Sequence, residues 1–254
     1  MKVIFVCFLA GMEAGIGTGL AGLSAATVIS PMLVTFLGFN SYEAITIALA
    51  SDVLASAASA YTYWKNKNLD IRGSLPLLAS VLVFTMIGSY VASLVLQTTV
   101  GNFSVIMTFF LGLRFLILPV MTTKDVLAAK DNRTRFIESL IGGAIIGSIC
   151  GFVGAGGGMM MLLVLTTILN YELKTAVGTS VFVMSFTAFT GAASHVVIGG
   201  MPDTIALIAC ILFTLLGAQG AAKFANGAEP KALNQITGVV LTVLGAVMIM
   251  VHFF

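Results

Sequence analysis

Ionisable side chains are scarce in this sequence, and some of them lie inside long stretches of apolar residues. Burying such a group in apolar surroundings is costly, so its presence there indicates chemistry rather than solubility. Asp52 lies about halfway along the apolar stretch 42–64 and could accept a proton or pair with a cation. Arg114 also lies inside an apolar stretch and could attract an anion. Glu13 is a candidate for proton coupling, and His195 for handling substrate or protons.

Each of these residues also has a structural interpretation. Asp52 could form a buried pair with Arg114 or accept a hydrogen bond from a backbone donor. The long side chain of Arg114 could instead extend toward water at the end of its segment. Glu13 is expected near the turn of a helix hairpin, where it could reach water, and His195 could form an interfacial hydrogen bond. The sequence leaves these alternatives open.

A glycine-rich stretch, GFVGAGGGMMM, interrupts another apolar segment. Gly156, Gly157 and Gly158 weaken a helix at this point and let a ligand approach the backbone. A helix that starts after them would present unpaired N–H groups and the positive end of its dipole, which together bind anions. Ser24 and Thr27 lie at the corresponding place in the first half of the chain, with Ser24 as a candidate N-cap. Two such helix starts facing one another could hold one small anion.

Hydroxyl side chains open a further apolar segment at Thr179 and Ser180. They could bind the anion or bond to carbonyls one turn back. The adjacent pair Ser194 and His195 invites a serine-hydrolase interpretation, but neighbouring residues on a helix point about 100° apart and do not face each other. No nucleophile-turn motif accompanies the pair, so no enzyme is expected. The three cysteines have no CxxC spacing, and we expect neither a metal site nor a cofactor.

Composition identifies the surroundings of these residues. Of the 254 residues, 59% are hydrophobic and only 9% are charged, whereas soluble domains carry about 25% charged residues. Several apolar runs of about 20 residues follow one another with short polar gaps, which predicts an all-α integral membrane protein in the lipid bilayer. The runs are continuous rather than alternating, which argues against a barrel. A net charge of only +2 gives no indication of nucleic-acid binding.

The sequence also matches itself at a shift of 132 positions, without a gap over about 45 residues. We interpret this as a first repeat at 1–121, a cytoplasmic linker at 122–135 and a second repeat at 136–254. Each repeat begins with a long apolar stretch that glycines break into a hairpin of two short or broken helices. Three ordinary stretches follow, so about ten transmembrane helices are predicted. The matched glycines, which also suit close helix packing, are Gly15 and Gly147, Gly19 and Gly151, and Gly22 and Gly154.

The basic residues indicate how the repeats are oriented. Ten of the twelve Lys and Arg residues fall in loops on one predicted face, which places that face in the cytoplasm and both termini outside the cell membrane. The basic loop at 65–72 corresponds to the loop at 199–203, which has no Lys or Arg. Corresponding loops therefore lie on opposite faces, as in the inverted-topology repeats that are common among secondary transporters.

Two stretches of the second half, GFVGAGGGMMMLLVL and LKTAVGTSVFVMSFTAFTGAASHVVIGGMPD, resemble the TauE/SafE family of membrane transporters, the sulfite exporter family. The first half is similar through GLAGLSAATVISPMLV, YEAITIALASD and AYTYWKNKNLD, so the resemblance covers most of both repeats. It implies transport of a small anionic sulfur compound such as sulfite, thiosulfate or a sulfonate. The first half departs from the pattern, with Ser24-Ala25-Ala26 in place of three glycines and Thr46-Ile47-Ala48 in place of Gly-Thr-Ser.

These observations lead to the hypothesis of a secondary transporter in the cell membrane, an exporter with alternating access around a midplane anion site. The alternatives are uptake coupled to protons through Asp52 or Glu13, and a non-transporting membrane subunit of a partner complex. The sequence leaves the anion, the coupling ion and the oligomeric state open. The residues predicted to bind the substrate are Ser24, Thr27, Arg114, Gly156, Gly157, Gly158, Thr179, Ser180 and His195.

Overall fold

A computed structural model describes residues 2–93, 109–110, 113–114, 116–118, 132–153 and 157–253. Within these ranges the regular structure is entirely α-helical, as the sequence predicts. Most of the predicted linker, together with Gly156, lies outside them. Four helices in the described part of the chain are long and apolar enough to cross a membrane, namely Lys2–Ala21, Glu43–Lys65, Leu173–Val197 and Thr204–Gly227. The all-helical membrane character is thereby confirmed, and the count of ten crossings stays a prediction.

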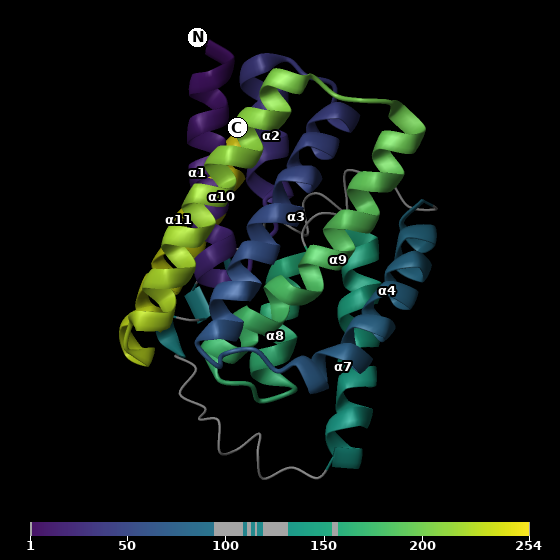
Figure 1. Ribbon diagram of the computed structural model, residues 1–254, viewed down its shortest axis with the longest axis vertical. Coiled ribbons are helices and arrows are strands. Elements are labelled where there is room, and N and C mark those ends of the chain that lie inside the picture. Colours follow the sequence, from purple (N-terminus) through teal and green to yellow (C-terminus); the bar gives the residue numbers. More distant parts are fainter. Residues whose placement is uncertain are drawn as a thin grey trace. The chain divides into compact units, whose positions relative to one another are not determined.

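The chain divides into two compact units, and each of them takes segments from both predicted repeats. Unit 1 comprises Met1–Leu69 and Val177–Gly227, and unit 2 comprises Asp70–Ala176 and Ala228–Phe254. Unit 1 contains α1 (Lys2–Ala21), α2 (Ala26–Leu37), α3 (Ser41–Lys65), most of α9 (Leu173–Gly199) and α10 (Thr204–Gly227) (Figure 1). Unit 2 contains α4 (Ile71–Ser93), α7 (Asn132–Val153), α8 (Gly157–Thr167), the start of α9 and α11 (Pro230–Phe253).

The first predicted hairpin is present, with its break between α1 and α2. Gly22 has a φ of +65°, a left-handed conformation that glycine adopts without steric cost. The Thr18 hydroxyl lies 2.9 Å from the carbonyl oxygen of Ala14 and 2.8 Å from that of Leu23, so its one proton is shared between them and links the end of α1 to the break. The second helix is short, as expected, at 12 residues. The first is longer than expected, since its 20 residues are enough to cross a membrane.

Helix boundaries recur in the second half at the shift found in the sequence. The starts of α3 and α9, at Ser41 and Leu173, lie 132 residues apart. Gly38 and Asn170, one shift apart, both have a left-handed φ, at 70° and 57°. We expected the second short helix to begin after Gly158. The described part of α8 already includes Gly157 and Gly158, so two of the three glycines are helical.

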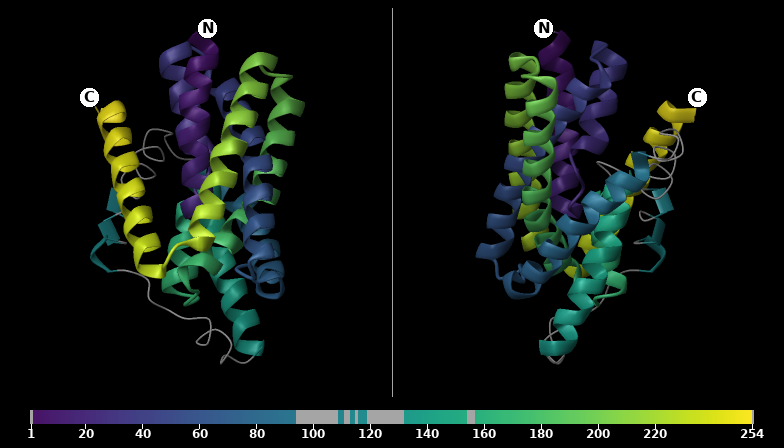
Figure 2. Two further views of the ribbon diagram at one scale, coloured as in Figure 1. Left: turned by 60° about the vertical axis from the view of Figure 1, so that its left-hand side comes forward. Right: turned by 90° about the vertical axis from the view of Figure 1, so that its right-hand side faces the viewer.

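Glycines line a helix pair in each unit, as the packing interpretation predicts. In unit 1 α1 lies beside α10, and a Cβ on Gly15 would meet the backbone of Thr214 and Ala218 (Figures 1 and 2). In unit 2 α7 lies beside α4, and a Cβ on Gly147 would meet the backbone of Val81. Because α7 and α4 correspond to α1 and α10 under the shift, the two units use the same kind of packing. Gly19 packs on α10 in the same way, and the surroundings of Gly151 lie outside the described side chains.

Candidate functional site

A buried carboxylate lies at the centre of unit 1. Asp52 on α3 is only 1% exposed. The Ser24 hydroxyl, in the break between α1 and α2, donates to its Oδ2 at 2.7 Å, and the Ser56 hydroxyl donates to its Oδ1 at 2.8 Å. The backbone N–H of Ala25 also donates to this carboxylate. Three neutral donors therefore satisfy Asp52, including the kind of backbone donor that the sequence left as one alternative.

The start of α2 differs from the sequence-based expectation. Ser24 is not the N-cap, because that position is Ala25, which has no side-chain capping bond. The Ser24 hydroxyl donates its one proton to Asp52 Oδ2, and its oxygen accepts a longer bond of 3.4 Å from the backbone N–H of Ala26, so it contacts the first residue of α2 from the position before the N-cap. Thr27 donates to the Ser24 carbonyl at 2.7 Å. The Asp52 carboxylate thus supplies the negative charge that a helix N-terminus favours.

A row of polar side chains follows one face of α3. Asp52, Ser56, Ser59 and Tyr63 are spaced by three or four residues, which places them within an arc of about 60° at ~100° per residue. The Tyr63 hydroxyl donates to the Gly19 carbonyl at 2.8 Å, near the end of α1. Ser59 is fully buried, and its hydroxyl has no hydrogen-bond partner among the described residues. The sequence analysis did not single out Ser59, although this spacing could have revealed it.

The part of α9 that belongs to unit 1, from Val177 onward, packs against the same region. A Cβ on Gly178 would lie 2.9 Å from the Cβ of Tyr63, and one on Gly22 would meet the hydroxyl of Ser180. Ser180 donates to the Val177 carbonyl at 2.8 Å, which is the structural alternative that the sequence left open. Thr179 is also fully buried, but its hydroxyl has no partner within the described part of the chain. Of the two predicted hydroxyls, Thr179 is therefore the one with an unused donor.

The remaining predicted residues lie apart from this cluster or in unit 2. Glu13 was expected near the hairpin turn, but it lies in the middle of α1, about two turns before the break, because α1 continues further than expected. It is half-buried, as is His195 near the end of α9. Arg114 and the glycines Gly157 and Gly158 of α8 belong to unit 2. The cluster in unit 1 therefore unites Ser24, Thr27 and Asp52, with Thr179 and Ser180 on the adjoining part of α9.

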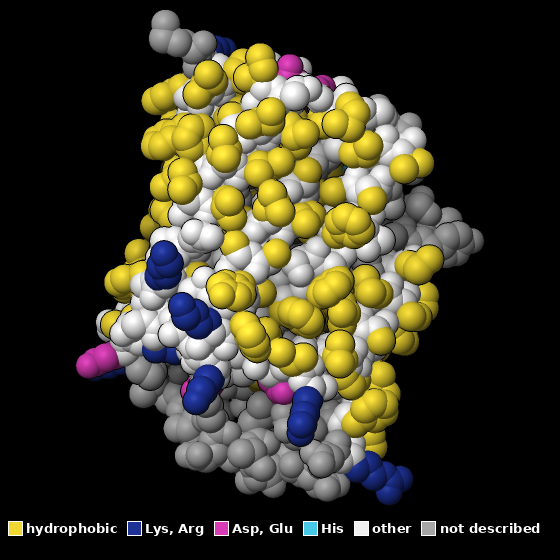
Figure 3. Space-filling view, in the orientation of Figure 1, with side chains coloured by type: hydrophobic (Ala, Val, Ile, Leu, Met, Phe, Trp, Pro, Cys, Tyr) yellow, Lys and Arg dark blue, Asp and Glu magenta, His cyan; other side chains and the backbone are white. Residues whose placement is uncertain are grey.

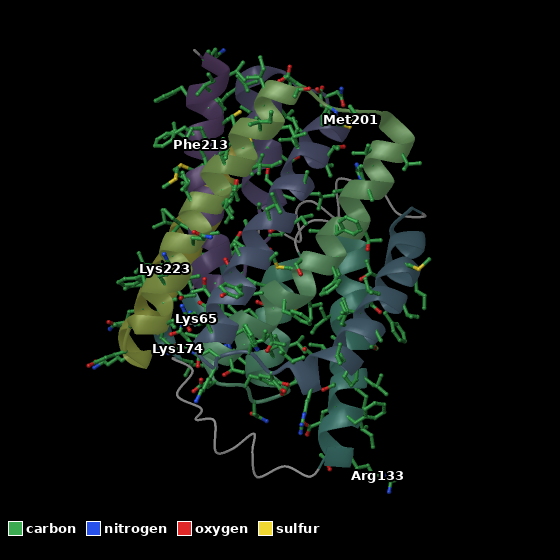
Figure 4. The ribbon with its side chains drawn as sticks, viewed as in Figure 1. Lys65, Arg133, Lys174, Met201, Phe213 and Lys223 are labelled. Atoms are coloured by element: carbon green, nitrogen blue, oxygen red, sulfur yellow. The ribbon has the colours of Figure 1, made fainter. Side chains whose placement is uncertain are left out.

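The surface of unit 1 suits a lipid environment. Apolar side chains follow one face of α10 and are exposed, including Ile205, Ile208, Leu212 and Leu216 (Figure 3). Lys65 and Lys223 lie at one end of this unit and Met201 at the other (Figure 4). This agrees with the separation of basic and non-basic loops in the sequence. Among the described residues, no group of three His, Cys, Asp or Glu side chains could hold a metal ion.

Comparison with known proteins agrees with these features. A family model described as "Sulfite exporter TauE/SafE" matches residues 7–248. "Probable membrane transporter protein YunE" of Bacillus subtilis is 25% identical, over 94% of this chain and 94% of its own length. "Probable membrane transporter protein YdhB" of the same organism is 24% identical, over 89% and 90%. "Probable membrane transporter protein MJ0441" of Methanocaldococcus jannaschii is 23% identical, over 95% and 94%. All of these descriptions are of transporters rather than enzymes. With a matching family model over nearly its whole length, the chain belongs to the TauE/SafE family of membrane transporters.

Proposed function

We propose that this protein is a secondary transporter that exports a small sulfur-containing anion, such as sulfite, thiosulfate or a sulfonate, across the cell membrane. Membership of a family described as sulfite exporters supports the substrate class. The observation that carries the proposal for this chain is the cluster around Asp52, a buried carboxylate bound by Ser24 and Ser56 at a helix break. In a chain this apolar, such a cluster marks the place where polar chemistry happens.

The proposed transporter has ten helices in two inverted repeats, with both termini outside. Alternating access would then come from movement of one bundle against the other around a midplane site. The starts of α3 and α9, which lie 132 residues apart, support this arrangement. The start of α2 at Ala26 and the glycines Gly157 and Gly158 of α8 are the repeat-related places where backbone N–H groups become available to an anion.

Export is the favoured direction for an electrostatic reason. A membrane potential that is negative inside drives anions outward with about 2.3 kcal/mol per charge per 100 mV. Export therefore needs no coupling ion, whereas uptake needs one. Proton-coupled uptake is the second candidate, because Asp52 is a titratable group bound by neutral donors. Glu13 is the other candidate for the coupling proton.

Flux through purified protein in liposomes tests this proposal. Labelled sulfite and thiosulfate are loaded inside, and a voltage or a pH gradient is imposed separately, with protein-free liposomes as the control. Voltage-driven flux of either anion supports export, and flux that requires a pH gradient supports coupled uptake. The absence of flux for every sulfur anion, with protein that is demonstrably folded, contradicts the substrate class. In that case a non-transporting membrane subunit becomes the better interpretation.

A further inference from the structure

The Ser59 hydroxyl is an unused donor in the most polar part of unit 1. It lies on the same face of α3 as Asp52 and Tyr63, seven residues after one and four before the other. Both of these neighbours contact the end of α1 or the break that follows it, through Ser24 and through the Gly19 carbonyl. Ser59 therefore faces the same break from between them. Its hydroxyl is fully buried and without a partner among the described residues, so this place has hydrogen-bonding capacity that the described part of the chain does not use.

The donors around Asp52 form a set that suits an oxyanion. They are hydroxyls and a backbone N–H at the start of α2, and the described contacts to the carboxylate include no cation. With Ser59 added, the set offers four neutral donors around the break. The Asp52 carboxylate already occupies the position of an anion at this helix start.

We propose that Asp52 is a resident anion, whose carboxylate holds the donors at the α1–α2 break until the transported anion replaces it there and takes up the Ser59 hydroxyl as well. This inference rests on the proposed function and identifies the subsite in which the anion is bound. Two negative charges in one low-dielectric site repel each other strongly, so the ionised carboxylate and the anion compete for the same donors. Ser59 is then a binding residue that becomes satisfied only in the occupied state.

Protonation of Asp52 has the same effect as replacing it. A neutral carboxyl group no longer repels an incoming anion and gives up charge-assisted hydrogen bonds. Acidification should therefore tighten anion binding at this subsite. The hydrogen bonds described for Asp52 come from none of the ionisable side chains on its own helix or on the helices around it. Those side chains are Lys2, Cys7 and Glu13 on α1, Tyr42, Glu43, Tyr61, Tyr63 and Lys65 on α3, Lys174 and His195 on α9, and Cys210 and Lys223 on α10.

Equilibrium binding to the purified full-length protein in detergent tests the inference, with sodium sulfite and sodium thiosulfate as probes. In the Asp52→Asn variant the charge is lost while the shape is kept. We expect thiosulfate to bind about tenfold more tightly or better, and its affinity to lose its dependence on pH. The Ser59→Ala variant should bind about tenfold more weakly. Ser51→Ala is the matched control, because Ser51 lies on the same helix, is equally buried, and bonds to the Ile47 carbonyl.

Each outcome decides the question. A folded Asp52→Asn variant that binds thiosulfate no better than the wild type overturns the inference. If that variant does not fold, Ser59→Ala still decides, because an affinity equal to that of Ser51→Ala overturns the inference and a selective loss supports it. If no variant binds a sulfur anion but Asp52→Asn gains affinity for nitrate or chloride, the result supports the inference that Asp52 competes with a bound anion. The same result contradicts the proposal that the substrate is a sulfur anion. Sulfite flux in liposomes without any gain in Asp52→Asn contradicts this inference alone.

Discussion

The buried Asp52 carboxylate in unit 1 is satisfied locally, by neutral groups on its own helix and at the helix break. An ion pair would give Asp52 a permanent partner, and removing either member would leave a buried charge uncompensated. Hydroxyl and amide donors can instead exchange one acceptor for another at smaller cost. The bonds from Ser24 and Ser56 therefore fit a carboxylate that is released during a cycle better than one that only holds the fold together.

The Tyr63 hydroxyl has a structural role that a single substitution can measure. Tyr63 is fully buried and donates to the Gly19 carbonyl, one of the acceptors left over at the end of α1. Tyr63→Phe removes the donor and leaves this carbonyl unpaired, so we expect a loss of about 1–3 kcal/mol in stability. Tyr61→Phe is the matched control, since Tyr61 lies on the same helix and is 61% exposed. Thermal unfolding in detergent compares them, and equal melting temperatures would show that this bond contributes nothing.

At the scale of the element, the conformation and contacts of Gly22 hold the break between α1 and α2. Gly22→Ala should cost about 1–2 kcal/mol for the left-handed φ, plus the clash of the new Cβ with the Ser180 hydroxyl. Gly38→Ala separates the cost of the left-handed φ from the cost of the clash. Gly38 has the same kind of φ, but no atom lies within 4 Å of the added Cβ. We expect Gly22→Ala to lower the melting temperature more than Gly38→Ala does. Adding Ser180→Ala should recover part of the difference, and its failure to do so would exclude the clash.

The close packing of α1 on α10 predicts that an alanine substitution destabilises the protein at one glycine and stabilises it at another. A Cβ on Gly15 would lie 2.7 Å from the backbone N of Ala218, and backbone cannot move aside as a flexible side chain can. Gly15→Ala should therefore destabilise the protein by about 1–3 kcal/mol. Gly220 on α10 has no atom within 4 Å of an added Cβ, so Gly220→Ala should stabilise the helix by up to about 1 kcal/mol. Unfolding measurements that give the same sign for both variants would contradict the described packing.

Elements were easier to predict than the partners of buried side chains. The apolar runs and the glycine cluster predicted the hairpin of α1 and α2 because both features are local in the sequence. The extra length of α1, which moved Glu13 away from the turn, was missed because helix ends depend on a few weak local preferences. The bond from Ser24 to Asp52 joins residues 28 positions apart and depends on how α3 is rotated. The sequence of α3 does not reveal how the helix is rotated about its own axis. The three- and four-residue spacing along α3 does predict which residues share a face.

At the scale of the whole molecule, helix boundaries recur along the chain, and helices of the two predicted repeats pack in pairs. Packing of α1 with α10 and of α7 with α4 combines the first helix of one predicted repeat with the fourth described helix of the other, within each unit. Each predicted repeat therefore depends on the other for a packing partner, and we expect that neither folds alone.

Sidedness is the property of the whole molecule that most directly tests the inverted repeats. Met201 is 73% exposed in the loop before α10, and Lys223 is exposed near the far end of that helix. Most of α10 lies between them, and the excess of Lys and Arg on the side of Lys223 predicts that this side faces the cytoplasm. In a background without the three native cysteines, a membrane-impermeant maleimide should label the Met201→Cys variant in intact cells. The Lys223→Cys variant should be labelled only after the membrane is permeabilised. Both variants must react in detergent, which controls for expression and accessibility. The reverse pattern would place both termini in the cytoplasm, and labelling of both variants in intact cells would show that α10 does not cross the membrane.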